Sequence, residues 1–237
     1  LIPDLDAATV ASGCVVAYTG ADGNEHIVPL CLVTDGDVIF IVPSVGMYRV
    51  KQNSKAFNDI DGHWAKKYID FITARELFLG TGSGMFSPDI PMTRAMFVTV
   101  LGRLMGVSKS EYTGKAFDDV PTGTWYSAFV LWASQNGIVD GYGHRRFGPN
   151  DPVTREQMCT MLVRFLRKQE ITLPENPAAE FSDVDDISSW TLEAVAYCQR
   201  AGLVDGMGEN RINPLGLATR AQVAAIYMRL ILSILSN

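Results

Sequence analysis

The sequence lacks three features that would assign it quickly to a class: a long hydrophobic run, an excess of positive charge and a cysteine framework. No apolar run reaches the roughly 20 residues of a membrane-spanning helix, and the apolar stretch after Ile226 is broken by Arg229 and Ser233. The formal net charge is −6, whereas nucleic acid and anionic lipid attract basic faces. Neither membrane insertion nor nucleic-acid binding is therefore expected.

The motifs of common catalytic and metal sites are missing as well. The three histidines lack metal-ligand spacing, and there is neither a Gly-x-Ser-x-Gly turn nor a zinc-protease helix motif. The carboxylates Asp183, Asp185 and Asp186 lack the rest of an EF-hand loop. The sequence thus predicts a non-enzymatic chain with no metal and no cofactor.

Four cysteines are too few for a disulfide scaffold. Cys159 and Cys198 lie in helical patterns, which is typical of small core residues. A two-residue turn at Asp22-Gly23 would place Cys14 opposite Cys31 in a hairpin. Because this register depends on the turn alone, free thiols are the favoured prediction and a disulfide between Cys14 and Cys31 is the alternative.

The composition that is present, 47% hydrophobic and 19% charged residues among 237, is that of a folded protein. The chain begins with leucine, not methionine, so we expect it to be a piece of a larger protein. Residues 1–52 are β-rich and predict a short antiparallel meander. It is either the end of a β domain, which we favour, or a small sheet packed on its neighbour. The expected strands are Cys14–Thr19, His26–Val33, Val38–Val42 and a fourth near Met47–Val50.

From Phe57 onward the chain repeats itself three times. Each copy has a Phe-x-Asp, a tryptophan, a Gly-x-Gly, a proline and a Thr-Arg pair, in that order. The step is 61 residues from Trp64 to Trp125 and 65 residues from Trp125 to Trp190. The other landmarks are Asp59, Asp119 and Asp183; Gly80, Gly141 and Gly206; Pro88, Pro149 and Pro214; and Arg94, Arg155 and Arg220.

Each repeat predicts two helices joined by a long loop rich in glycine and proline. Two helices cannot bury both apolar faces alone, whereas three such units can pool their helices. We therefore expect residues 53–237 to form a mainly α, pseudo-threefold bundle, monomeric as a chain, with repeats at about 57–105, 117–168 and 181–235. The expected helices are 63–77, 93–105, 125–136, 154–168, 190–201 and 219–235.

The repeated Thr-Arg pair has a structural half and an ambiguous half. The threonine is an expected helix N-cap, and Gln157 and Gln222 can complete a capping box where Met96 cannot. The arginine opposes the helix dipole, so its repetition indicates a compensating partner. That partner is either the aspartate at the start of a repeat, or a ligand carboxylate gripped by the guanidinium.

The tryptophans and glycines are also open to two interpretations. A tryptophan at a helix start usually anchors a core, although an exposed indole would stack on a sugar ring. The Gly-x-Gly loops are expected to be turns that end the first helix, where positive φ favours glycine, and the backbone N–H groups freed at these turns could meet an anionic sugar. Tyr142 is a candidate stacking residue in one copy, where the others have Thr81 and Met207.

Together these motifs resemble the S-layer homology domain, with Thr93-Arg94-Ala95-Met96 standing where that family has Thr-Arg-Ala-Glu. The resemblance implies a secreted bacterial protein held at the cell surface, in the wall or S-layer. It also implies non-covalent binding of a secondary cell-wall polysaccharide, often pyruvylated, in grooves between repeats. The implied ligand-binding residues are the arginines, aspartates, tryptophans and first glycines of the three repeats, with Tyr142. The alternatives are a protein-interaction scaffold and, less favoured because the aspartates come one per repeat, a wall-glycan hydrolase.

Overall fold

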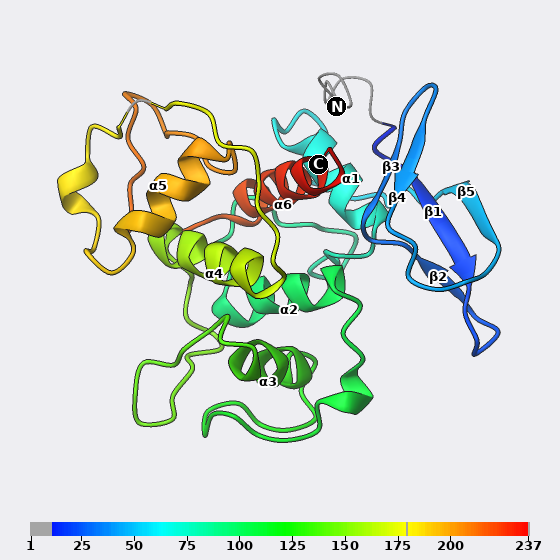
Figure 1. Ribbon diagram of the computed structural model, residues 1–237, viewed down its shortest axis with the longest axis horizontal. Helices are drawn as coiled ribbons and strands as arrows, with labels where there is room; N and C mark the ends of the chain where they lie inside the picture. Colours follow the sequence, from blue (N-terminus) through cyan, green and yellow to red (C-terminus); the bar gives the residue numbers. More distant parts are fainter. Residues whose placement is uncertain (1–10, 179, 237) are drawn as a thin grey trace. The chain divides into compact units, whose positions relative to one another are not determined.

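The computed structural model describes residues 11–178 and 180–236 (Figure 1). Within these ranges the chain is mainly α-helical, with six α-helices and five short strands near the amino end. The chain divides into two compact units. The first comprises the residues up to Ile90 together with those from Arg220 onward, and the second comprises Pro91–Thr219. The division expected between residues 52 and 53 stays a prediction.

The strands of the first unit are antiparallel, as the sequence predicts, but they form two small sheets, because the strand expected over His26–Val33 is divided into two. β1 (Cys14–Thr19) lies between β2 (Glu25–Ile27) and β5 (Tyr48–Gln52), in the order β2-β1-β5. β3 (Cys31–Val33) pairs with β4 (Val38–Phe40). The last strand thus returns beside the first.

The hairpin between β1 and β2 differs from the expected two-residue turn. Gly20 N–H donates to the Asn24 carbonyl at 2.9 Å, and Gly23, with φ of 76°, donates to the Gly20 carbonyl at 3.0 Å. This is a three-residue loop ending in a left-handed glycine. The extra residue shifts the register by one, so the predicted placement of Cys14 opposite Cys31 is wrong.

The cysteines near the sheets have separate partners. Cys14 pairs with Gln52 of β5, and its Sγ donates to Gln52 Oε1 at 3.0 Å. The sulfur of Cys31 instead accepts from the backbone N–H of Val16 at 3.4 Å. All four cysteines of the chain are free thiols, which confirms the favoured prediction.

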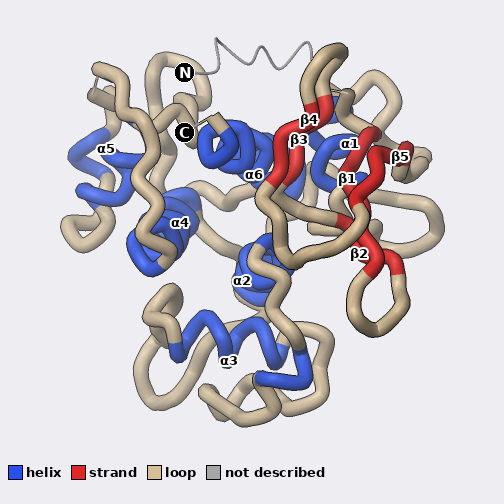
Figure 2. The backbone as a smooth tube through the Cα atoms, turned by 45° about the vertical axis from the view of Figure 1, so that its right-hand side comes forward, coloured by secondary structure: helices blue, strands red, loops and turns tan. Residues whose placement is uncertain are grey.

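The strands pack on the helices of the same unit, α1 (Lys66–Ala74) and α6 (Arg220–Leu235) (Figure 2). Their buried core includes Val15, Val28 and, from the end of α1, Ala74. The strands and these helices thus share one core within the first unit, and the favoured expectation, the end of a β domain, stays a prediction.

One buried arginine joins this sheet to α1. Arg75 is 1% exposed; its Nε and Nη2 donate to the Cys31 carbonyl at 3.2 and 2.8 Å, and its Nη1 donates to the Phe71 carbonyl at 2.9 Å. Burial lowers the pKa of Arg75 to about 10, so the side chain stays charged at neutral pH. This charged group thus supports the contact through hydrogen bonds to backbone oxygens.

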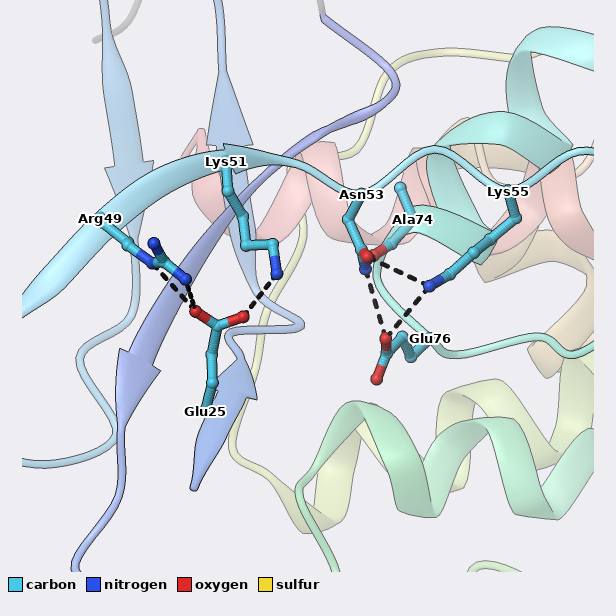
Figure 3. A network of polar contacts seen from close by, with 7 residues as sticks. All are labelled: Glu25, Arg49, Lys51, Asn53, Lys55, Ala74 and Glu76. Atoms are coloured by element: carbon cyan, nitrogen blue, oxygen red, sulfur yellow. Dashed lines mark hydrogen bonds and ion pairs between the residues drawn. The ribbon is translucent and has the colours of Figure 1, made fainter. Parts of the chain in front are cut away.

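Polar side chains continue this contact at the surface (Figure 3). Asn53 donates to the Ala74 carbonyl at 2.6 Å, and Lys55 reaches Glu76 at 3.4 Å. On the sheet itself, Glu25 of β2 accepts from Arg49 and Lys51 of β5, on the opposite side of β1. The outer strands are thereby tied together as well as to the helix.

The second unit contains the other four helices. They are α2 (Arg94–Leu104), α3 (Ser127–Gln135), α4 (Arg155–Lys168) and α5 (Leu192–Arg200). All six predicted helices are confirmed, although those after the tryptophans begin two or three residues later than expected. The second helix of each repeat packs on the first helix of the next: α2 on α3, α4 on α5 and, in the first unit, α6 on α1.

The segments before the three Thr-Arg pairs exchange hydrogen bonds in a closed cycle. Met92 N–H donates to the Ala218 carbonyl at 2.8 Å, Val153 to Met92 at 2.8 Å, and Ala218 to Val153 at 3.0 Å. These three residues occupy equivalent positions of the three repeats. All of them lie in the second unit, which the cycle links through residues far apart in the sequence.

Candidate functional site: a groove between an arginine and a tryptophan

Thr93 and Thr154 cap their helices as predicted. Thr93 Oγ1 accepts from the backbone N–H of Met96 at 3.2 Å. Thr154 Oγ1 accepts from Gln157 N–H at 3.3 Å, and Gln157 Oε1 accepts from Thr154 N–H at 3.5 Å. This capping box confirms the prediction for α4 and leaves α2 with the single bond that Met96 permits.

Each repeated arginine reaches into the loop of the next repeat. The side chains of Arg94, Arg155 and Arg220 are buried, at 4–5% exposed, and each donates from Nε and Nη2 to two backbone carbonyls. Burial lowers the pKa of all three, that of Arg220 to about 10. The acceptors are Phe147 at 2.9 Å and Asp140 at 3.0 Å for Arg94, Ile212 at 2.6 Å and Asp205 at 2.9 Å for Arg155, and Phe86 at 2.9 Å and Leu79 at 2.8 Å for Arg220.

The repeated aspartates hold the same loop peptides from the other side. Asp119 accepts from the N–H groups of Phe147 and Gly148, both at 2.8 Å, while Arg94 takes the Phe147 carbonyl. Asp183 does the same for Ile212 and Asn213, and Asp59 for Phe86 and Ser87. Each carboxylate is thus occupied by backbone.

The alternative in which the repeated arginine forms a direct ion pair with the repeated aspartate is wrong. Among the described residues, the ion pairs within 4.0 Å include none between Arg94 and Asp119, Arg155 and Asp183, or Arg220 and Asp59. The two charges attract at longer range, across the peptide they both hold. We name this arrangement of arginine, peptide and aspartate the loop clamp.

The loop clamp predicts a defined pH dependence. Burial raises the pKa of Asp119, but the backbone N–H groups of Phe147, Gly148 and Asp119 itself, together with the charge of Arg146, outweigh it, so the pKa lies below its usual value. The stabilisation is therefore complete above the unfolded pKa and is lost as pH falls through the lower folded pKa. Asp119→Asn, which turns one acceptor into a donor facing an N–H group, should lose about 1–2 kcal/mol at pH 7 and flatten the loss toward pH 2.

Urea unfolding at pH 7 and pH 3 measures both effects. Asp118→Asn is the matched control, because the Asp118 carboxylate is exposed and, among the described residues, forms ion pairs with the surface cations Lys115 and Arg145. Equal pH profiles for Asp119→Asn and the wild type would contradict the clamp.

The tryptophans do not anchor a core. Trp64, Trp125 and Trp190 are 60, 48 and 60% exposed, so the interpretation as buried anchors is wrong. Each stands two residues before the first helix of its repeat, on a turn that projects the indole away from the packed face. The alternative, an indole available to a ligand, remains open.

A groove in the second unit lies beside Trp190. Its volume is about 350 Å³, and it brings together one residue type from each repeat: Arg94 of the first, Tyr142 of the second and Trp190 of the third. The Arg94 guanidinium lies 4.6 Å from the Tyr142 ring centroid. The groove thus combines two aromatic side chains with a positively charged guanidinium. Its other lining residues are Ile138, Val139, Asp140, Gly141, Gln157, Thr160, Met161 and Arg164.

The sequence analysis missed several of these side chains. Gln157, Thr160 or Met161, and Arg164 follow one another at intervals of three or four residues, which places them on one face of α4. Arg164 Nη1 lies 2.6 Å from Asp140 Oδ2, and both side chains are at least a third exposed. Helical spacing from Gln157 was the signal that could have found Arg164.

The first glycines are required for close approach. An added Cβ at Gly141 would lie 2.2 Å from the Arg146 carbonyl and 2.8 Å from the Phe117 ring. At Gly80 it would lie 2.7 Å from the Met85 carbonyl, and at Gly206 3.2 Å from Asn210 Cα. The positive φ expected for the Gly-x-Gly loops is found at their second glycines, Gly82, Gly143 and Gly208, and not at the first.

None of the described helices is long and apolar enough to cross a bilayer. Among the described residues, no group of three or more metal-ligating side chains comes together.

Comparison with known proteins identifies the repeats. The S-layer homology domain matches residues 56–96, 116–159 and 180–224, more than half of the chain. The amylopullulanase of Thermoanaerobacterium thermosulfurigenes is 34% identical over 81% of this chain and 10% of its own length. The exoglucanase XynX of Acetivibrio thermocellus is 34% identical over 75% of this chain and 16% of its own length.

Surface-layer proteins are similar over the same region. The S-layer protein of Bacillus thuringiensis subsp. finitimus is 26% identical over 72% of this chain and 20% of its own length. The chain thus spans a fifth or less of the relatives named here. The S-layer homology domain is a wall-binding module, so the chain is the wall-anchoring part of a secreted surface protein. From its three matched repeats, the chain belongs to the S-layer homology domain family.

Proposed function

We propose that the chain anchors its parent protein non-covalently by binding an anionic wall polysaccharide, such as one carrying pyruvyl ketals, and that it does so without catalysis. The observation that carries the proposal is the groove in which the exposed indole of Trp190 stands beside two arginines. An aromatic face packs on the apolar face of a sugar ring. A guanidinium binds a carboxylate through paired hydrogen bonds.

The two arginines of the groove have different roles in this proposal. Arg94 is committed to the carbonyls of Phe147 and Asp140 and supplies positive potential from the base of the groove. Arg164 is partly exposed and pairs with the exposed carboxylate of Asp140. Because an exposed ion pair contributes little, a ligand carboxylate can replace Asp140 at small cost. Arg164 is therefore the proposed carboxylate-binding residue.

The proposal extends to the arrangement of the repeats. The cyclic hydrogen bonds of Met92, Val153 and Ala218 and the three loop clamps support a pseudo-threefold bundle within one chain, formed by residues 53–237. Trp64 and Trp125 are exposed like Trp190. We propose that they serve equivalent sites. Several weak sites on one polymer raise the overall affinity without new contacts.

Removing the indole tests the proposal. Trp190→Ala should weaken binding to purified wall polysaccharide about tenfold, within the roughly 1–3 kcal/mol by which an aromatic side chain stacks on a ring. Isothermal titration calorimetry measures the affinity. Leu215→Ala is the control, because Leu215 is a similarly exposed apolar residue that does not line the groove.

Amidating the carboxylates of the polymer supplies the second arm. It should weaken binding to the wild type and leave little further loss for Arg164→Gln. Undiminished binding of Trp190→Ala, or of the wild type to the amidated polymer, contradicts an anionic glycan ligand. Release of reducing sugar from the polymer contradicts the absence of catalysis.

A further inference from the structure

We infer that Glu156 is a positioning residue that holds Trp190 in place over the groove and makes this groove the strongest site of the chain. The inference rests on the proposed function, because it concerns the affinity of the same groove. Glu156 does not line the groove and touches no ligand in this account. It acts through the turn that carries the indole.

The carboxylate of Glu156 is buried and takes hydrogen bonds from both sides of Trp190. Glu156, 3% exposed, lies in the first turn of α4. Its Oε2 accepts from the backbone N–H of Ser188 at 3.0 Å and lies 3.2 Å from Thr191 Oγ1. Its Oε1 accepts from Ser188 Oγ at 2.8 Å. Three contacts thus fix the residues that flank the tryptophan.

The other two repeats do not use a carboxylate at this position. Ala95 and Ala221 stand where Glu156 stands, and both are buried. Helix packing at this point therefore requires only a small side chain. Among the described residues Glu156 has no cation within ion-pairing distance, and burying an unpaired carboxylate is costly. The hydrogen bonds from the tryptophan-bearing turn and the dipole of α4 are what offset this cost.

Fixing the turn raises affinity by reducing what binding must order. Trp190 is 60% exposed and stands outside the helix, so packing alone leaves the indole several orientations. A ligand that stacks on it must select one of them, and the ordering cost subtracts from affinity. Glu156 orders the turn already in the unbound protein, so the ligand has less to order when it binds. The equivalent residue is Ala95 in the repeat before Trp125, and Ala221 in α6, which packs on the helix after Trp64. Alanine offers no carboxylate, so these two turns lack this support.

A set of variants tests the inference. Glu156→Ala should weaken binding to purified wall polysaccharide about tenfold. Glu156→Gln keeps an acceptor for Ser188 N–H and should lose threefold or less, so it provides the rescue. Nuclear magnetic resonance should show faster hydrogen exchange of the Ser188 amide in Glu156→Ala. Thermal unfolding of each variant verifies that the protein is folded at the temperature of the titration.

The decisive measurement is made without the indole. In a Trp190→Ala background, Glu156→Ala should cause no further loss, because the residue it positions is gone. Full additivity of the two losses, or wild-type affinity of Glu156→Ala, overturns the inference and leaves the proposed function standing. A wild type that does not bind the polymer overturns both.

Discussion

Replacing Arg155 with alanine is expected to lower the free energy of unfolding by about 3–5 kcal/mol, since hydrogen bonds from a charged donor contribute about 1.5–3 kcal/mol each. The guanidinium donates to the carbonyl of the buried Ile212 at 2.6 Å and to that of Asp205 at 2.9 Å. Arg155→Lys should recover less than half, because one ammonium group cannot reach both acceptors in the same fork geometry.

Urea unfolding followed by circular dichroism measures this loss. Arg164→Ala is the matched control, from the same helix but with an exposed pair, and should cost less than about 1 kcal/mol. Equal stability of the two variants would show that the loop clamp is dispensable. The prediction also affects how binding studies are interpreted. If an Arg155 variant no longer binds the wall, the first explanation is loss of the fold, and not loss of a contact with the ligand.

The second large effect is expected at Arg75, which joins β3 to α1. Arg75→Leu keeps much of the apolar stem but leaves the carbonyls of Cys31 and Phe71 without their donor, at about 1–3 kcal/mol for each unsatisfied group. The expected loss is therefore about 2–5 kcal/mol. The strands should also detach more readily from the helix, because the guanidinium is the main polar link between them.

Limited proteolysis with mass spectrometry measures that detachment. Cleavage within residues 11–52 should be faster in Arg75→Leu than in the wild type. Arg49→Leu, which removes an exposed arginine from the same strands, should leave the rate unchanged. Wild-type cleavage rates in Arg75→Leu would show that the apolar core alone, through residues such as Val15 and Val28, holds the sheet.

The helices and their caps could be predicted because their signals are local. Apolar spacing placed α4 to within a residue, and Thr154 with Gln157 specified its capping box. The partners of the arginines could not, because Arg155 and Ile212 are 57 positions apart and Arg220 and Phe86 are 134 apart. Every residue has a backbone carbonyl, so the sequence does not show which one accepts from an arginine. An aspartate or a ligand carboxylate is the partner that residue types alone indicate.

The sequence predicted the types of residue that line the groove, but it did not predict which individual residues come together there. Tyr142 and Trp190 were candidates from their position in the repeats, and the structure brings them together with Arg94. Exposure of the indoles depends on a turn of two residues before each helix, which propensity does not resolve. The hairpin register failed for a similar reason, since one additional loop residue reverses the faces of a strand.

The packing of α6 on α1 has a consequence for how the molecule comes into existence. The strands cover part of α1, but the partners that α6 offers to α1 and that Arg220 offers to the peptide of Phe86 come only when residues from Arg220 onward arrive. A polypeptide that crosses a membrane as a thread emerges from one end, so its leading repeat has to wait for the trailing one. Contacts this distant in the chain form slowly. In exported molecules the contacts of α6 with α1 would therefore form late, after α6 has passed through the translocation channel.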